Sequence, residues 1–231
     1  MINSSTLNRI ENSRKGYENT GATLEREFLG TIKANEYKTL AYATLHEKAT
    51  TEKLSTEQEF VNMLKLREAA QKEFTDTLSL ANKDNYINFK KSMDLVEQCQ
   101  PGDPENPSHF FSKALYNYIK NRFEDDYTLK FFTAVGGTHL DVVHKIDFYF
   151  KLYAKETGEE QTYATVDITG RNSKDKTRAN VLLNIDPEEK DKYDPSQINN
   201  NFDKEFFTKK IAEFGEDIIQ ALIENYKTKA E

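Results

Sequence analysis

The stretch DVVHKIDFYFKLYAKETGEEQTYATVDITGR, residues 141–171, decides how this chain is expected to fold. Apolar and polar side chains alternate over 141–154 and again over 160–170, which is typical of strands that bury one face. Between these runs, the polar, glycine-containing segment KETGE favours a tight turn. The stretch therefore predicts a β-hairpin with one apolar face and one polar face.

The turn sets the expected register of the hairpin. A three-residue turn that ends at Gly158, in the left-handed conformation, places Asp147 directly opposite Asp167 and Lys145 opposite Thr169. A slip by one residue would move Asp147 among the apolar side chains. Turn chemistry and alternation therefore predict two opposed carboxylates on the polar face.

Two opposed carboxylates repel each other, and such a pair needs solvent, a shared proton or a cation. Oxygen ligands without cysteine suit Mg²⁺ or Mn²⁺. Next in the chain, residues 171–178 (RNSKDKTR) hold four basic side chains and one acidic one, for which phosphate is the natural partner. A cation beside such a segment suits phosphodiester hydrolysis. The simpler alternative is an exposed sheet face with two solvated acids near lysines.

Outside the hairpin, the pattern predicts an α+β protein. Three of the five prolines lie in 100–107, which can neither continue a helix nor join a central strand. We expect a helical N-terminal region over 1–100, a linker at 101–107, and an α/β core over 108–231. The core is expected to hold a mixed or antiparallel sheet, flanked by helices, whose other elements are strands at 127–135 and 179–186 and helices at 108–123 and 203–228.

The N-terminal region shows helical periodicity. A capping signal at 55–59 (STEQE) precedes an apolar stripe, which predicts a long amphipathic helix over 56–81. Ser108 is expected to cap the first helix of the core. Weaker helical patterns occur near 22–33, 36–48 and 84–98.

The paired acids and the basic segment resemble the PD-(D/E)xK nuclease superfamily. In that superfamily, one strand of a hairpin presents an acid, and the next presents an acid, a spacer and a lysine. Asp147 matches the first acid and Asp167 the second, whereas Thr169 stands where the lysine is expected. Lys145 is placed to supply that charge from across the pair. The resemblance covers at most residues 108–231, and the helix at 108–123 lacks the glutamate that the family's opening helix often lends.

The resemblance implies a restriction-endonuclease-like core and a metal-dependent nuclease, either an endonuclease or an exonuclease, that hydrolyses DNA. It implies that Asp147 and Asp167 bind Mg²⁺ or Mn²⁺ and that Lys145 assists the attacking water or the phosphate. The residues expected to contact the DNA strand are Thr169, Arg171, Lys174 and Lys176.

Two alternatives remain open at this point. In the first, a non-catalytic accessory factor of phage or mobile-element type uses a degenerate nuclease fold to bind nucleic acid or protein, which the loss of the lysine at position 169 favours. In the second, the amphipathic helix over 56–81 mediates self-association or docking of a protein partner.

Composition limits the setting in which the protein works. The 231 residues carry a net charge of −7, and the mean hydropathy is −0.80. A single cysteine, Cys99, allows neither an internal disulfide nor a cysteine-based zinc site. Apolar stretches are too short to cross a bilayer. We therefore expect a cytoplasmic protein without a membrane segment.

Overall fold

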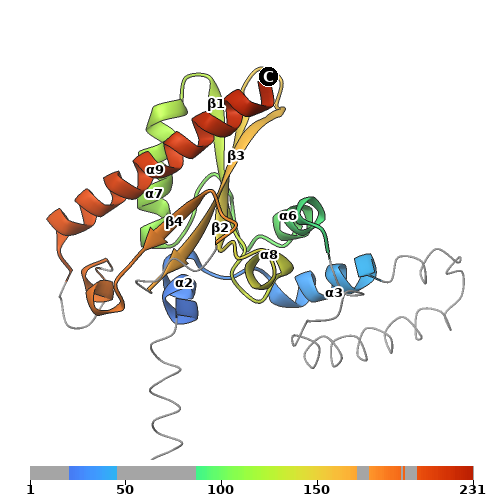
Figure 1. Cartoon of the computed structure of the whole chain (residues 1–231), viewed down its shortest axis with the longest axis horizontal. Coiled ribbons are helices and arrows are strands. Elements are labelled where there is room, and N and C mark those ends of the chain that lie inside the picture. Colours follow the sequence, from blue (N-terminus) through green and yellow to red (C-terminus); the bar gives the residue numbers. More distant parts are fainter. Residues whose placement is uncertain (1–20, 46–86, 171–176, 194, 196–201, 231) are drawn as a thin grey trace, which may run out of the picture.

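The structure is a computed structural model, and it describes residues 21–45, 87–170, 177–193, 195 and 202–230. In these residues a four-stranded sheet carries helices on both faces (Figure 1). The expected α+β class is confirmed. The helix predicted over 56–81 lies outside the described residues.

The sheet has the strand order β1-β2-β3-β4. Its first three strands pair antiparallel, and β4 runs parallel to β3, so the sheet is mixed. The strands are β1 (Tyr127–Thr133), β2 (Phe148–Ala154), β3 (Glu160–Thr169) and β4 (Val181–Asn184). All four lie within the runs predicted from alternation, but β2 begins seven residues later than expected.

Helices cover both faces of this sheet. In Figure 1, α7 (Phe110–Phe123) and α9 (Lys204–Ala230) lie on one side, and α6 (Phe89–Gln98) lies on the other. On the side of α6 are also α3 (Ala34–Leu45) and the short α8 (His139–Val142). A further helix, α2 (Gly21–Leu29), lies below the ends of the strands, and the 3₁₀ helix η2 (Pro187–Lys192) follows β4.

Alternation along the strands gives each face its own core. Even-numbered residues of β2 and β3, such as Phe148 and Val166, join the core formed with α7 and α9. Odd-numbered Tyr149 joins the second core, and its hydroxyl donates to the Met93 carbonyl of α6 at 3.2 Å. Helices before residue 101 contribute side chains to both cores. The division of the chain at 101–107 stays a prediction.

The hairpin has the predicted register where the strands are regular. Phe148 pairs with Val166 and Leu152 with Thr162, and Gly158 has a φ of +70°. The turn itself is one residue longer than expected, because Ala154 N–H donates to the Glu159 carbonyl at 3.0 Å. A register shift next to Leu152 compensates for the longer turn. The acid-bearing end of the hairpin therefore keeps the predicted alignment.

The first half of the predicted strand at 141–154 is wrong. Thr138 caps α8, since its hydroxyl accepts from Asp141 N–H at 3.0 Å, while Asp141 Oδ2 accepts from Gly137 N–H at 3.2 Å. These two hydrogen bonds stabilise a helical turn where the alternation predicts a strand. Lys145 then adopts a φ of +60° before β2, so it does not pair with Thr169, which aligns with Asn184 of β4 instead.

Two smaller findings concern the helices. Ser108 does not cap α7, because His109 occupies that position and makes no capping hydrogen bond through its side chain. Asp203 does cap α9, accepting from Phe206 N–H at 3.0 Å. In the described parts of the chain, none of the helices has the length and apolar content that crossing a bilayer requires.

Gly30 directly follows the end of α2 and lies close to His109. It has a φ of +73°, and a Cβ there would lie 2.5 Å from Nε2 of His109. We expect Gly30→Ala to lower the free energy of unfolding by about 1–3 kcal/mol, because it adds both backbone strain and a steric clash. Urea denaturation measures this loss. Gly102→Ala is the matched control, since nothing lies within 4 Å of its added Cβ, and an equal loss in both variants would contradict the prediction.

Candidate functional site

Asp147 and Asp167 meet where β2 begins and the polar end of β3 lies beside it. The backbone of Asp147 is held from both sides, since its N–H donates to the Val166 carbonyl at 2.9 Å and its carbonyl accepts from Ala134 N–H at 2.7 Å. Its Oδ2 accepts from Ile168 N–H at 2.7 Å. A side-chain hydrogen bond joins the carboxyl groups of Asp147 and Asp167. The two acids predicted to face each other are therefore in direct contact.

The Asp147 carboxyl is buried, with 5% of the residue exposed. Burial first, and then the negative charge of Glu25, raise the pKa of Asp147 to about 9. The Asp167 and Asp141 charges act in the same direction, against the hydrogen bond from Ile168 N–H. Burial also raises the pKa of Asp167. A hydrogen bond between two carboxyl groups requires a proton on one of them, which agrees with the raised pKa of Asp147.

Glu25 of α2 is the acidic neighbour that the sequence did not reveal. Burial and the charges of Asp141 and Asp167 raise its pKa to about 7. On the same helix Leu24, Phe28 and Leu29 enter the core with α7, which fixes the helix against the sheet. The family resemblance would place a glutamate on the helix at 108–123, but the nearest one, Glu124, is an exposed C-cap. The sequence predicts a helix near 22–33, but no local pattern indicates that this helix packs beside the hairpin.

Asp141 and Lys145 flank these acids. Burial raises the pKa of Asp141, while hydrogen bonds from the backbone N–H groups of Gly137 and Gly136 oppose that shift. Asp141 therefore has a structural role at the start of α8 that accounts for its position. Lys145 is exposed, and its positive charge lowers the pKa values of Glu25, Asp141 and Asp167. Lys145 therefore lies outside the strand, and its role toward water or phosphate stays a prediction.

The predicted strand-contacting residues are placed only in part. Thr169 ends β3, half-buried, and its carbonyl accepts from Ile185 N–H at 2.9 Å. The other three, Arg171, Lys174 and Lys176, lie outside the described residues. The last basic residue of the segment, Arg178, is exposed. Burial lowers the pKa of His144, and the positive charge of Arg178 acts in the same direction. The structure thus describes Thr169 and the last basic residue of the segment 171–178.

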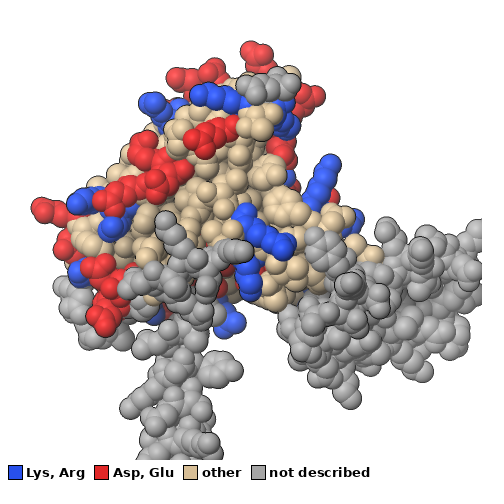
Figure 2. Space-filling model, in the orientation of Figure 1, with Lys and Arg blue, Asp and Glu red and all other residues tan. Residues whose placement is uncertain are grey.

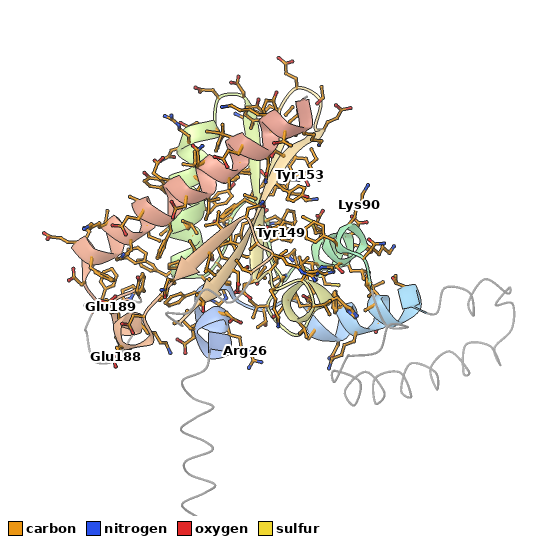
Figure 3. All side chains as sticks on the ribbon, viewed as in Figure 1. Arg26, Lys90, Tyr149, Tyr153, Glu188 and Glu189 are labelled. Carbon is orange, nitrogen blue, oxygen red and sulfur yellow. The ribbon has the colours of Figure 1, made fainter. Side chains whose placement is uncertain are left out.

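The surface around the site is unevenly charged. Figure 2 shows acidic side chains along α9 and near η2, whereas Lys and Arg side chains stand near the middle of this face, over the region of β2 and β3. Figure 3 shows Arg26, the neighbour of Glu25 on α2, at the lower end of the molecule. The positive charges of Arg26 and Lys145 lower the pKa of Glu25, so two basic side chains act on the acids.

The donor chemistry of the site suits a hard divalent cation. Glu25, Asp147 and Asp167 offer only carboxylate oxygens, the ligands that Mg²⁺ and Mn²⁺ favour. Burial raises the pKa values of all three, and the negative charges of neighbouring acids raise those of Glu25 and Asp147 further. A bound cation would offset that repulsion. Among the described residues no group of three or more His, Cys, Asp or Glu side chains is arranged as a ready metal site.

No family model, curated protein or solved structure matches this chain.

Proposed function

We propose that the protein is a Mg²⁺- or Mn²⁺-dependent nuclease that hydrolyses phosphodiester bonds in DNA. The observation that carries the proposal is the direct contact of Asp147 with Asp167, from neighbouring strands, within reach of the charge of Glu25. Burying several acids together is costly without a compensating cation or shared protons. Such an arrangement is more typical of a functional site than of a fold-stabilising contact.

The acids and the nearby lysine divide the work in this proposal. Asp147, Asp167 and Glu25 would hold the cation, which when bound lowers the pKa of water and offsets negative charge on the phosphate. Asp147 is held most firmly, because its backbone and its Oδ2 are both hydrogen-bonded. Lys145 would contact the scissile phosphate or orient the attacking water. Lys145 is exposed, which supports this role.

Lys145 provides a test of this division. We expect Lys145→Met to lower kcat for Mg²⁺-dependent cleavage by about 10–100-fold, because the variant loses a positive charge near the phosphate. Lys113→Met, on the exposed face of α7, is the matched control and should leave kcat unchanged. Steady-state cleavage of a labelled DNA measures both variants. Equal rates for the wild type and Lys145→Met would remove Lys145 from the mechanism.

The substrate side of the proposal depends on the basic segment. Residues 171–178 carry four basic side chains and one acidic one, and Thr169 stands just before them. We propose that Thr169, Arg171, Lys174 and Lys176 position the DNA strand through its phosphates. A cytoplasmic location, and a homo-oligomer or protein partner held by the N-terminal helices, belong to the same proposal.

A nuclease panel tests the function as a whole. The full-length protein is incubated with plasmid, linear and branched DNA, with Mg²⁺, with Mn²⁺, or with a chelator. We expect cleavage of at least one substrate that depends on the divalent cation. Absence of cleavage on every substrate with both cations would overturn the nuclease proposal.

The second candidate function is a non-catalytic factor that binds nucleic acid or protein. Two observations favour it. Thr169 stands in the position of the family's lysine. Among the described residues, no group of three or more acidic, histidine or cysteine side chains is arranged to hold a metal ion. Calorimetric titration with Mn²⁺ separates the two functions. A degenerate site gives no heat of binding that depends on Asp147, whereas a nuclease site does.

A further inference from the structure

Two segments that meet beside β3 bring only positive charge to the surface. Residues 87–93 (INFKKSM) hold Lys90 and Lys91 and no acid, and residues 177–183 (TRANVLL) hold Arg178 and no acid. Lys90 and Arg178 are exposed, and Lys91 is half-buried. Within the described parts of the chain, none of these three side chains forms an ion pair. Their charges therefore stay available to a partner, in a protein whose net charge is −7.

Aromatic contacts hold the first turn of α6 against the sheet. The centroid of the Phe89 ring lies 6.2 Å from that of Tyr163 on β3 and 5.5 Å from that of His144. The carbonyl of Ile87, just before the helix, accepts a hydrogen bond from Nε2 of His144 at 3.1 Å. The turn that carries the two lysines is therefore fixed beside β3.

Arg178 reaches the same part of β3 from the segment that leads into β4. Asn180 Oδ1 accepts from Thr165 N–H at 3.0 Å, and Asn180 N–H donates to Thr165 Oγ1 at 3.0 Å. Because β4 runs parallel to β3, the residues before Asn180 lie toward Tyr163. Ala179 and Tyr163 both pack against the second core. Arg178 is therefore held near the place where α6 contacts the strand.

The surrounding surface keeps this positive charge local. Figure 3 shows Lys90 on the outer side of α6, pointing away from the sheet. Figure 2, in the same orientation, shows acidic side chains along α9 and near η2, and further Lys and Arg side chains near the middle of the face. On α6 itself the acids are Asp94 and Glu97, and Glu97 is paired with Lys151 at 2.6 Å. The positive charge is therefore concentrated at the first turn of α6 and beside it.

We propose that Lys90, Lys91 and Arg178 form a basic surface that binds the phosphate backbone of DNA. The inference rests on the proposed function for the identity of the partner. Arg178 is the last residue of the basic segment 171–178, so this surface extends that segment toward α6. The aromatic rings beside the basic side chains are half-buried and contact each other, so they are not free to stack on bases. The surface therefore contacts phosphates and does not distinguish base sequences.

The test is the binding of a fluorescein-labelled DNA duplex to the full chain, in a chelator, measured by fluorescence anisotropy over a range of salt concentrations. We expect the double variant Lys90→Gln, Lys91→Gln to weaken the Kd by about five- to tenfold at low salt. The slope of log K against log salt should become shallower by about one to two, because each lost phosphate contact removes about 0.9. Arg178→Gln should produce a smaller change of the same kind. Glutamine keeps the helix propensity, and the backbone N–H of residue 91 still donates to Asn88.

The matched control is the double variant Lys204→Gln, Lys227→Gln. Both lysines are exposed on α9, and their replacement removes the same two positive charges. This variant should bind DNA with nearly the wild-type Kd and slope, because α9 carries the acidic part of the surface. An equal loss in the two double variants would overturn the inference, since it would reflect only the net charge of the protein. Thermal denaturation verifies that each variant is folded.

The remaining outcomes separate this inference from the proposed function. If the wild type cleaves DNA and the variant of Lys90 and Lys91 binds it as tightly as the wild type, the surface is wrong and the nuclease stands. If binding depends on the two lysines but no substrate is cleaved, the surface stands and the nuclease fails. A wild type that does not bind DNA overturns the surface. So does poly-glutamate that binds as tightly as DNA with the same dependence on the lysines, because the partner would then be an acidic protein segment.

Discussion

Replacing Asp147 with asparagine is expected to reduce Mg²⁺-dependent DNA cleavage by a factor on the order of 10³ or more, which is the scale at which loss of a central charge-stabilising group acts. Asparagine keeps the shape and can still accept the hydrogen bond from Ile168 N–H, which the aspartate accepts at 2.7 Å. It loses the negative charge that a divalent cation requires. The same reasoning gives a comparable loss for Asp167→Asn.

This prediction is checked by cleavage kinetics at saturating DNA over a range of Mg²⁺ concentrations. Asp217→Asn is the matched control, because Asp217 is exposed on α9, and it should retain the wild-type rate. Thermal denaturation of each variant verifies the fold. Cleavage that persists in both Asp147→Asn and Asp167→Asn would show that the two acids do not form the catalytic centre.

The same asparagine at position 147 is expected to stabilise the protein at alkaline pH when no divalent cation is present. Burial and neighbouring negative charge raise the pKa of Asp147 to about 9. In the unfolded chain an aspartate titrates near pH ~4. Between these values the native state retains a proton that the unfolded chain has already released.

The sign of the effect follows from that proton. Because the native state binds more protons than the unfolded state, the free energy of unfolding falls as pH rises from about 4 toward 9. An asparagine does not titrate, so it removes the contribution of Asp147 to this fall. We expect Asp147→Asn to exceed the wild type by at least about 2 kcal/mol at pH 8.5 and to match it near pH 4, since each unit of pKa shift corresponds to about 1.4 kcal/mol.

Urea denaturation in the presence of a chelator, at several pH values from 4 to 8.5, measures both proteins. Asp217→Asn again serves as the control and should follow the wild-type curve. Glu25, whose pKa is raised to about 7, contributes a further decline below that pH, so the variant keeps some pH dependence. Parallel curves for the wild type and Asp147→Asn would contradict the buried, charge-coupled environment assigned to Asp147.

The contrast between the two predictions has a physical basis. The charge that a cation would need is the charge that destabilises the fold when the cation is absent. Removing it is expected to eliminate activity and increase stability, a combination common at sites selected for function. An acid with a purely structural role would lose stability on the same substitution, because its partners would be left unsatisfied.

Several elements were predictable because short-range chemistry determines them. Alternation specified β1, β3 and β4, and the apolar side of β2. The register between Phe148 and Val166 followed from a turn glycine and from the need to bury one face. That register holds although the turn is longer than expected, since burial constrains the pairing more strongly than loop length does.

The segment before β2 shows where local reasoning failed. Residues 141–147 alternate like a strand, yet the hydrogen bonds that Asp141 makes with Thr138 and Gly137 favour a helical turn. A few hydrogen bonds decided between two conformations of similar local free energy. As a result, Lys145 has a left-handed backbone conformation before β2 and is not part of a strand. Its positive charge therefore acts on the acids from a position outside the sheet.

The sequence by itself determined the α+β class, the hairpin, and the contact of Asp147 with Asp167, because side-chain periodicity and turn residues act over a few neighbouring positions. Only the tertiary structure decided that Glu25 joins them. Glu25 lies beside these acids because its apolar neighbours on α2 are buried against α7. This placement depends on packing between segments far apart in the chain, which no local pattern encodes.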